Sequence, residues 1–180
     1  MRIVILLVLL LTACTETENT IQSKQYYDLA GTLNEHISRL ESKHPQVEKT
    51  VVIKDKQDKI VTSDIDWNKE LELFLQTDLN KQSYQSAYTI QKEENVISYQ
   101  LKAGEKMPVK QLIVKLDAKG LPQHIEAEMY AKNYLYESEK KLTADFESNH
   151  LKRYQITGYQ QLFIGSKKTF SIEGKIKGDY

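Results

Sequence analysis

The sequence predicts an α+β fold in which one curved antiparallel sheet of about seven to nine strands carries two helices on one face, the N-terminal helix first. Two observations lead to this fold class. Apolar residues recur at helical spacing in two early segments, whereas from Tyr84 onward they alternate with polar residues, as in strands with one buried face. Turn signals interrupt the alternating part at intervals of about 10–15 residues, which is typical of an antiparallel meander.

The first helical segment covers residues 23–43, with Ser23 as its expected N-cap. Pro45 cannot continue a helix, so this helix should end near His44. A second, shorter helix should begin at Asp66, a favourable N-cap residue. Each segment has a single apolar stripe, which indicates packing on one surface. The stripes are Tyr26, Ala30, Leu33, Ile37 and Leu40, and then Trp67, Leu71, Phe74 and Leu75.

Residues 47–53 and 59–62 are rich in β-branched side chains and flank a polar break at residues 55–58, which predicts a β-hairpin. Residues 117–120 form a later turn that ends in Gly120, where a positive φ is needed. Further strands are expected at residues 87–90, 96–101, 112–116, 125–131, 142–146, 154–156, 160–164 and 170–176.

The chain begins with a targeting segment. Arg2 precedes nine apolar residues at positions 3–11, a run too short for a membrane span of about 20 residues but typical of a signal-peptide core. The segment Leu11-Thr12-Ala13-Cys14 resembles the lipobox of bacterial lipoproteins, and Cys14 is the only cysteine. The resemblance implies a signal peptide at residues 1–13 and a lipidated tether that starts at Cys14. The tether should extend to residue 22, and residues 23–180 should form a single α+β domain, because they contain no repeat and no linker.

By the same resemblance, Cys14 is acylated and makes the membrane a partner of the protein. Two acyl chains give stable anchoring, whereas one gives only marginal, reversible binding. In the sorting rule known for Gram-negative lipoproteins, aspartate after the cysteine favours the inner membrane. Thr15 occupies that position here, which implies the outer membrane and leaves the periplasmic or surface side open. The alternative interpretation is an ordinary secretory signal with an incidental cysteine.

The composition excludes some classes of partner. Loss of residues 1–13 removes Arg2 from the 25 basic residues, which leaves 24 against 25 acidic residues and a net charge of −1. Nucleic-acid binding needs clustered positive charge, so no nucleic-acid partner is expected. No cysteine remains for a disulfide, so stability must come from packing. The eleven tyrosines suit both strands and binding surfaces.

The motifs indicate no catalytic, cofactor or metal site. Residues 64–68 match the opening of a calcium loop, but Lys69 and Leu75 occupy the positions that need Gly and Glu. Helix capping explains the two aspartates of this segment. Residues 138–141 match the S-x-x-K pattern of penicillin-binding enzymes without its partner elements. The four histidines show no metal-ligand spacing. We therefore expect a protein that is not an enzyme and has no cofactor.

A group of tyrosines is the candidate partner surface. If residues 123–136 form one strand, Tyr130, Tyr134 and Tyr136 face away from the core as an aromatic stripe suited to an envelope protein or a glycan. If the strand instead breaks at Asn133, Tyr134 and Tyr136 face the core, because a slip of one residue inverts every side chain.

Two hypotheses of function follow. The leading one is a lipid-anchored envelope protein that acts by binding or by supporting an assembly. The alternative is a carrier of an apolar ligand, because a curved sheet closed by helices resembles, in outline, periplasmic lipoprotein carriers with a half-barrel and a helical lid. This alternative requires an apolar cavity between sheet and helices. An enzyme would instead need a cleft with paired carboxylates or a histidine cluster.

Overall fold

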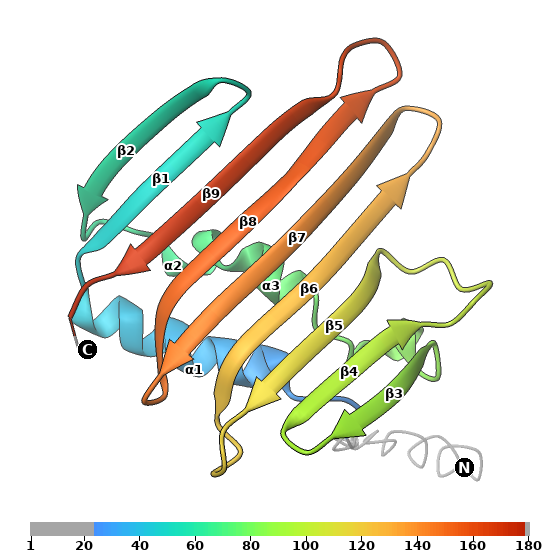
Figure 1. The fold of residues 1–180 in the computed structure, drawn as a ribbon, viewed down its shortest axis with the longest axis horizontal. Coiled ribbons are helices and arrows are strands. Elements are labelled where there is room, and N and C mark those ends of the chain that lie inside the picture. The colour runs from blue at the N-terminus through green and yellow to red at the C-terminus, as the bar shows by residue number, and fades with distance from the viewer. Residues whose placement is uncertain (1–23, 179–180) are drawn as a thin grey trace, which may run out of the picture.

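The computed structural model describes residues 24–178 and shows one open antiparallel sheet of nine strands with helices on one face (Figure 1). The helix α1 precedes the first strand, so the predicted fold class is confirmed. The signal peptide and Cys14 lie outside the described residues. The strands are β1 (Val47–Ile53), β2 (Lys56–Thr62), β3 (Tyr88–Glu93), β4 (Val96–Leu101), β5 (Val109–Leu116), β6 (Pro122–Lys132), β7 (Tyr136–Glu147), β8 (His150–Leu162) and β9 (Lys168–Ile176), and a short 3₁₀ helix, η1 (Gln82–Tyr84), precedes β3.

The strand order β2-β1-β9-β8-β7-β6-β5-β4-β3 brings the start and the end of the folded chain together. The β1–β2 hairpin forms one edge of the sheet, the helical segment crosses to the other edge, and β3 to β9 return strand by strand (Figure 1). β9 then pairs with β1, from Val47 opposite Ile176 to Ile53 opposite Phe170. The β1–β2 hairpin therefore joins the rest of the sheet only through β9, the last strand of the chain.

The first helix, α1 (Leu29–Lys43), is shorter than predicted. The prediction that it begins at Ser23 is wrong, because the carboxylate of Asp28 accepts a hydrogen bond from the backbone N–H of Gly31 at 2.9 Å and so caps the helix. A Cβ at Gly31 would collide with this carboxylate, which explains the glycine in the first turn. The helix ends as predicted at His44, which takes a left-handed φ of 45°.

The second predicted helix is divided at Leu71 into α2 (Trp67–Glu70) and α3 (Glu72–Gln76), because the backbone of Leu71 leaves the helical region. Asp66 caps α2 as predicted, through a hydrogen bond from the backbone N–H three residues later. The first N–H of α2 donates to the carboxylate of Glu41 in α1 at 3.0 Å. This bond holds α1 and α2 together as one layer.

Three strand predictions need correction. β7 begins at Tyr136 rather than at residue 142, because residues 136–141 are already paired with β6 and β8. β2 begins at Lys56 rather than at residue 59, so only Lys54 and Asp55 form the turn, and Lys54 has a φ of 55°. The strands predicted at residues 154–156 and 160–164 are one continuous strand, β8, because the residues between them stay paired with β7.

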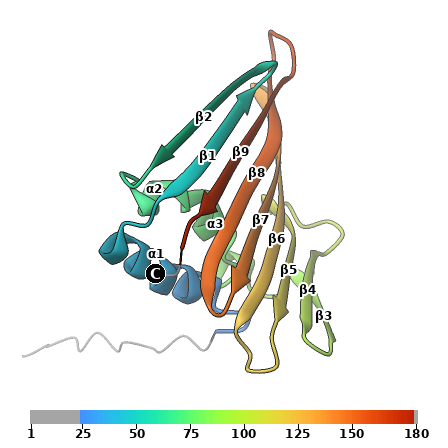
Figure 2. The ribbon, with the colours of Figure 1, turned by 60° about the vertical axis from the view of Figure 1, so that its left-hand side comes forward.

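The sheet has two chemically different faces. The side that carries Val47, Ile125, Leu142 and Tyr154 lies under the helices and forms the core, and we call it the helix face. The other side, the outer face, is lined by charged side chains that pair across strands, such as Lys141 with Glu126 at 2.7 Å. Figure 2 shows all helices on one side of the twisted sheet. This is the division that alternation along the strands predicted.

The fully buried ring of Tyr154 joins the sheet to the helix layer. It packs edge-on against Trp67, and its hydroxyl donates to a carboxylate oxygen of Glu70 at 2.7 Å. The other oxygen of Glu70 pairs with Lys49 of β1 at 2.6 Å. Burial first, and then the Glu70 carboxylate, raise the pKa of Tyr154, so its hydroxyl remains a donor. This chain of contacts fixes α2 above β1, β8 and β9.

Candidate binding groove

The helix layer covers only one end of the helix face. β8 has 13 residues and is about 40 Å long, whereas α1 has 15 residues and is about 22 Å long where it crosses the strands. On β7, Leu142 and Ala144 are buried beneath the helices, while Tyr136 and Lys140 further along are only partly covered. The same side of the sheet is therefore core at one end and accessible at the other (Figure 2).

The accessible end contains a groove of about 520 Å³, within the size range of ligand pockets. Strands β6 to β9 supply its floor, and the segment from α3 to η1 supplies one wall. We call this hollow the groove. Its floor carries Met129, Ala131, Tyr136, Ser138, Lys140 and Phe170, and its wall carries Lys81 and Tyr84.

The groove combines apolar surface with positive charge. Lys140 lies opposite Met129 in the β6–β7 pairing, so its alkyl chain borders the apolar floor. No ion pair within residues 24–178 involves Lys140. On the wall, the ammonium of Lys81 donates to the carbonyl of Gln76 at 2.8 Å and lies 5.2 Å from the ring centre of Tyr84. Neither groove lysine has a carboxylate partner within residues 24–178, and Lys140 is the one whose ammonium also makes no hydrogen bond there.

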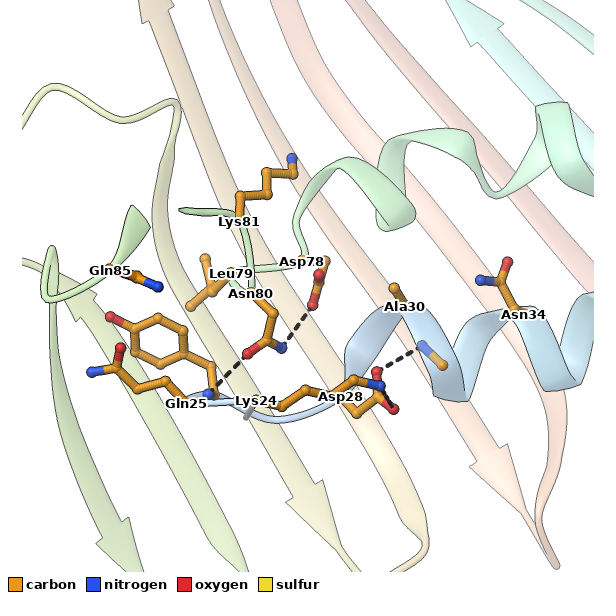
Figure 3. A pocket seen from close by; sticks show the side chains of 12 residues that line it. Lys24, Gln25, Asp28, Ala30, Asn34, Asp78, Leu79, Asn80, Lys81 and Gln85 are labelled. Atoms are coloured by element: carbon orange, nitrogen blue, oxygen red, sulfur yellow. Dashed lines mark hydrogen bonds and ion pairs between the residues drawn. The ribbon is translucent and has the colours of Figure 1, made fainter. Parts of the chain in front are cut away.

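A second hollow, of about 380 Å³, lies between the start of α1 and the segment after α3 (Figure 3). The side chain of Asn80 occupies its centre. Its oxygen accepts a hydrogen bond from the backbone N–H of Tyr26 at 3.0 Å, and its nitrogen donates to the carbonyl of Tyr27 at 2.9 Å and to Asp78 at 3.2 Å. Asp28, at the other end, is engaged in the α1 cap. These groups hold the N-terminal segment to the helix layer, so we assign this hollow a structural role.

Many of the tyrosines serve packing. The ring of Tyr26 contacts those of Tyr88 and Tyr99 edge-on, at centroid distances of 5.9 and 5.6 Å. All three rings are buried, and each hydroxyl has a backbone partner. Burial raises the pKa of Tyr88 and Tyr99, so both stay protonated. The high tyrosine content thus reflects a core that pairs apolar rings with polar ends.

The three tyrosines of the predicted stripe do not share one surface. β6 ends at Lys132, and Asn133 turns the chain, so the single strand over residues 123–136 is wrong. Tyr130 lies on the outer face beneath the ammonium of Lys110, whereas Tyr136 lies on the helix face in the groove. Tyr134 projects from the hairpin between the strands and is exposed.

His36 and His150 lie near each other, since the charge of His150 contributes to the lowered pKa of His36, whereas His124 lies apart from both. His124 is on the outer face, 2.7 Å from Asp145 and 3.7 Å from Glu126, where solvent weakens both interactions. His36 is buried in α1 against Phe146. Residues 24–178 contain no cluster of three or more His, Cys, Asp or Glu side chains arranged to hold a metal ion.

Comparison with known proteins adds no family: no protein-family description, curated protein or solved structure matches this chain. In the part of the chain that the structure describes, no helix is both long enough and apolar enough to cross a membrane. The assignment of a site therefore rests on the geometry. The groove was not predictable as a set of residues, because its floor comes from four strands and its existence depends on the short helix layer.

Proposed function

We propose that the protein is a lipid-anchored binding module of the bacterial cell envelope that holds an amphiphilic ligand in the groove. The observation that carries this proposal is the uncovered end of the helix face, where a groove of about 520 Å³ lies between the sheet and the helix layer. The proposed ligand has one apolar chain and an anionic head.

The lining supports an amphiphile over a purely polar or purely apolar ligand. Met129, Ala131 and Phe170 offer an apolar floor to a hydrocarbon chain. Lys140 lines the groove without an ion pair in residues 24–178, and Ser138 lies two residues before it on the same face. A cation beside apolar surface matches an anionic head attached to a hydrocarbon chain.

The groove is open along one side, so it would hold a chain without enclosing it. This favours a ligand that enters and leaves easily, as expected of a module that passes ligand to or from a membrane. Acylation of Cys14, which we infer from its resemblance to the lipobox, would keep the groove near the bilayer in which such ligands dissolve. No step of this proposal requires catalysis or a cofactor.

The test is binding of dodecyl phosphate, below its micelle concentration, to the chain from residue 14 onward with Cys14→Ser, measured by calorimetry. Lys140→Glu should weaken binding about tenfold or more, which corresponds to about 1.4 kcal/mol. Ala131→Trp should fill the floor and remove binding. The matched control is Lys115→Glu, an exposed lysine on the outer face, which should leave binding unchanged. Absence of binding to the unmodified groove, or equal losses in Lys140→Glu and Lys115→Glu, would contradict the proposal.

A further inference from the structure

Two hairpin ends form an apolar projection at the far end of the sheet. The β6–β7 loop and the β8–β9 loop lie side by side, because the N–H of Phe163 donates to the carbonyl of Leu135 at 2.8 Å. Tyr134, Phe163 and Ile164 are 83 %, 80 % and 84 % exposed. We call this surface the apolar tip, and it consists of Tyr134, Leu135, Leu162, Phe163 and Ile164.

The tip is unusual for a protein surface. Single exposed apolar side chains are ordinary, but contiguous ones mark interaction sites. Within residues 24–178, nine large apolar side chains are exposed, and five of them form the tip. A sixth, Ile53, ends β1 beside it, since the N–H of Lys54 bonds the carbonyl of Thr169 in β9 at 3.0 Å. Hairpin loops usually carry small polar residues, so these side chains are not explained by turn formation.

The charges around the tip are predominantly positive. Lys167 and Lys168 follow Phe163 and Ile164 after the two turn residues Gly165 and Ser166, and Lys132 is already paired with Glu137 at 2.7 Å. The ammonium of Lys167 lies over the ring of Tyr159, 3.4 Å from its centre. Around the neighbouring β1–β2 turn, the lysines at positions 54 and 56 are balanced by the aspartates at positions 55 and 58. The tip therefore presents apolar side chains next to two lysines that are not part of an ion pair in residues 24–178.

From this arrangement we infer that the apolar tip inserts into the interfacial region of a lipid bilayer that carries anionic headgroups. Apolar and aromatic side chains reach about 5–10 Å into such an interface, while adjacent lysines extend their ammonium groups to the headgroups. The tip consists of the ends of two adjacent hairpins, where large apolar side chains are exposed to the surroundings. It lies at the end of the sheet opposite the start of α1 (Figures 1 and 2). Insertion requires neither Cys14 nor the groove, although Tyr136 lines both the groove and a small hollow at the tip itself.

The test is sedimentation of the chain from residue 14 onward, carrying Cys14→Ser to remove the acyl anchor, with phosphatidylcholine vesicles that contain about one-third phosphatidylglycerol or none. The protein should sediment with the anionic vesicles. Phe163→Ser combined with Ile164→Ser should lower the bound fraction about tenfold or more. Both side chains are exposed, so these substitutions remove no core contact.

The matched control is Ile60→Ser combined with Val61→Ser, which removes two exposed apolar side chains from β2, away from the tip. This control should bind vesicles like the unchanged chain. Absence of sedimentation with the anionic vesicles, or equal losses in the two double variants, would overturn the inference. Specific capture of an envelope protein through the tip without any vesicle binding would also overturn it and assign the tip to a protein partner.

A fluorescence measurement tests insertion itself. Tyr134→Trp adds an indole at the tip, and the native Trp67 is buried and provides a constant background. The added emission should shift to the blue with anionic vesicles, and an unshifted emission in sedimented protein would contradict insertion. Ala131→Trp, which blocks the groove, should still bind vesicles, and the tip variant should still bind dodecyl phosphate. Ligand binding in the groove and membrane insertion of the apolar tip can therefore be refuted independently of each other.

Discussion

Gly174 of β9 should be intolerant of even one added carbon. A Cβ at this position would lie 2.1 Å from Cζ, 2.2 Å from Cε1 and 2.3 Å from the hydroxyl oxygen of Tyr154. The Tyr154 ring is fully buried and cannot move outward without leaving Trp67 and Glu70. Gly174→Ala must therefore displace the ring that joins the sheet to α2.

The expected cost follows from these contacts. Overfilling a packed core typically costs about 1–3 kcal/mol. Loss of a hydrogen bond to a charged group costs about 1.5–3 kcal/mol more, here the bond from Tyr154 to Glu70. We expect Gly174→Ala to lower the free energy of unfolding by about 3–5 kcal/mol, which lowers Tm by about 10 °C for a domain of this size.

The assay is chemical denaturation followed by the fluorescence of Trp67, the only tryptophan. Thr169→Ala, at an exposed position of the same strand, is the control and should change stability by less than about 0.5 kcal/mol. Tyr154→Leu should relieve the collision with the added Cβ. The double variant Tyr154→Leu, Gly174→Ala should therefore lose less free energy of unfolding than the sum of the losses in the two single variants. A loss below about 1 kcal/mol in Gly174→Ala would refute this reasoning.

Two further predictions concern acid stability and the anchor. Burial, together with nearby Arg39 and His150, lowers the pKa of His36 to about 4, below the 6.5 of an unfolded histidine. The folded state therefore binds the proton less readily than the unfolded state. The free energy of unfolding is not reduced by this effect above pH 6.5, and it falls as the pH drops toward 4. Between pH 7 and 4.5 the wild type should lose about 2 kcal/mol more than His36→Leu in denaturation curves, and equal losses would contradict a buried neutral His36. The wild-type chain should incorporate radiolabelled palmitate in a bacterial host and Cys14→Ser should not; equal label on the two chains, or none on the wild type, would contradict acylation at Cys14.

Most of the fold was predictable because each strand buries one face. Alternating apolar residues identify β4 at its observed bounds and the central parts of β5 to β7, although β7 extends well before the predicted start at residue 142. The capping chemistry of Asp66 locates the start of α2. The division at Leu71 leaves no such signal, because the apolar spacing continues through it. At α1 the error has a local cause: Asp28 is as favourable an N-cap residue as Ser23, and it is Asp28 that accepts the hydrogen bond from the N–H of Gly31.

The functional surfaces were less predictable. Asn133 is a turn residue whose side chain accepts hydrogen bonds from the N–H groups of Leu135 and Tyr136, and this turn separates Tyr130 from Tyr136. The asparagine is a signal that favours the broken strand over the continuous one. The sequence also contains a pattern that marks the apolar tip: the three consecutive apolar residues Leu162, Phe163 and Ile164 directly precede the turn at Gly165. In the structure all three are exposed. No sequence pattern marks the groove. It exists because the strands are longer than the helix layer that covers them.

Methyl NMR tests ligand binding in the groove most directly. In the chain from residue 14 onward with Cys14→Ser, labelled methionine and alanine methyls report on the groove at Met129 and Ala131 and on the second hollow at Ala30. Titration with dodecyl phosphate below its micelle concentration should shift the Met129 and Ala131 signals saturably and leave Ala30 unchanged. Saturable shifts at Ala30 alone, or no shift at any of the three methyls, would contradict binding in the groove.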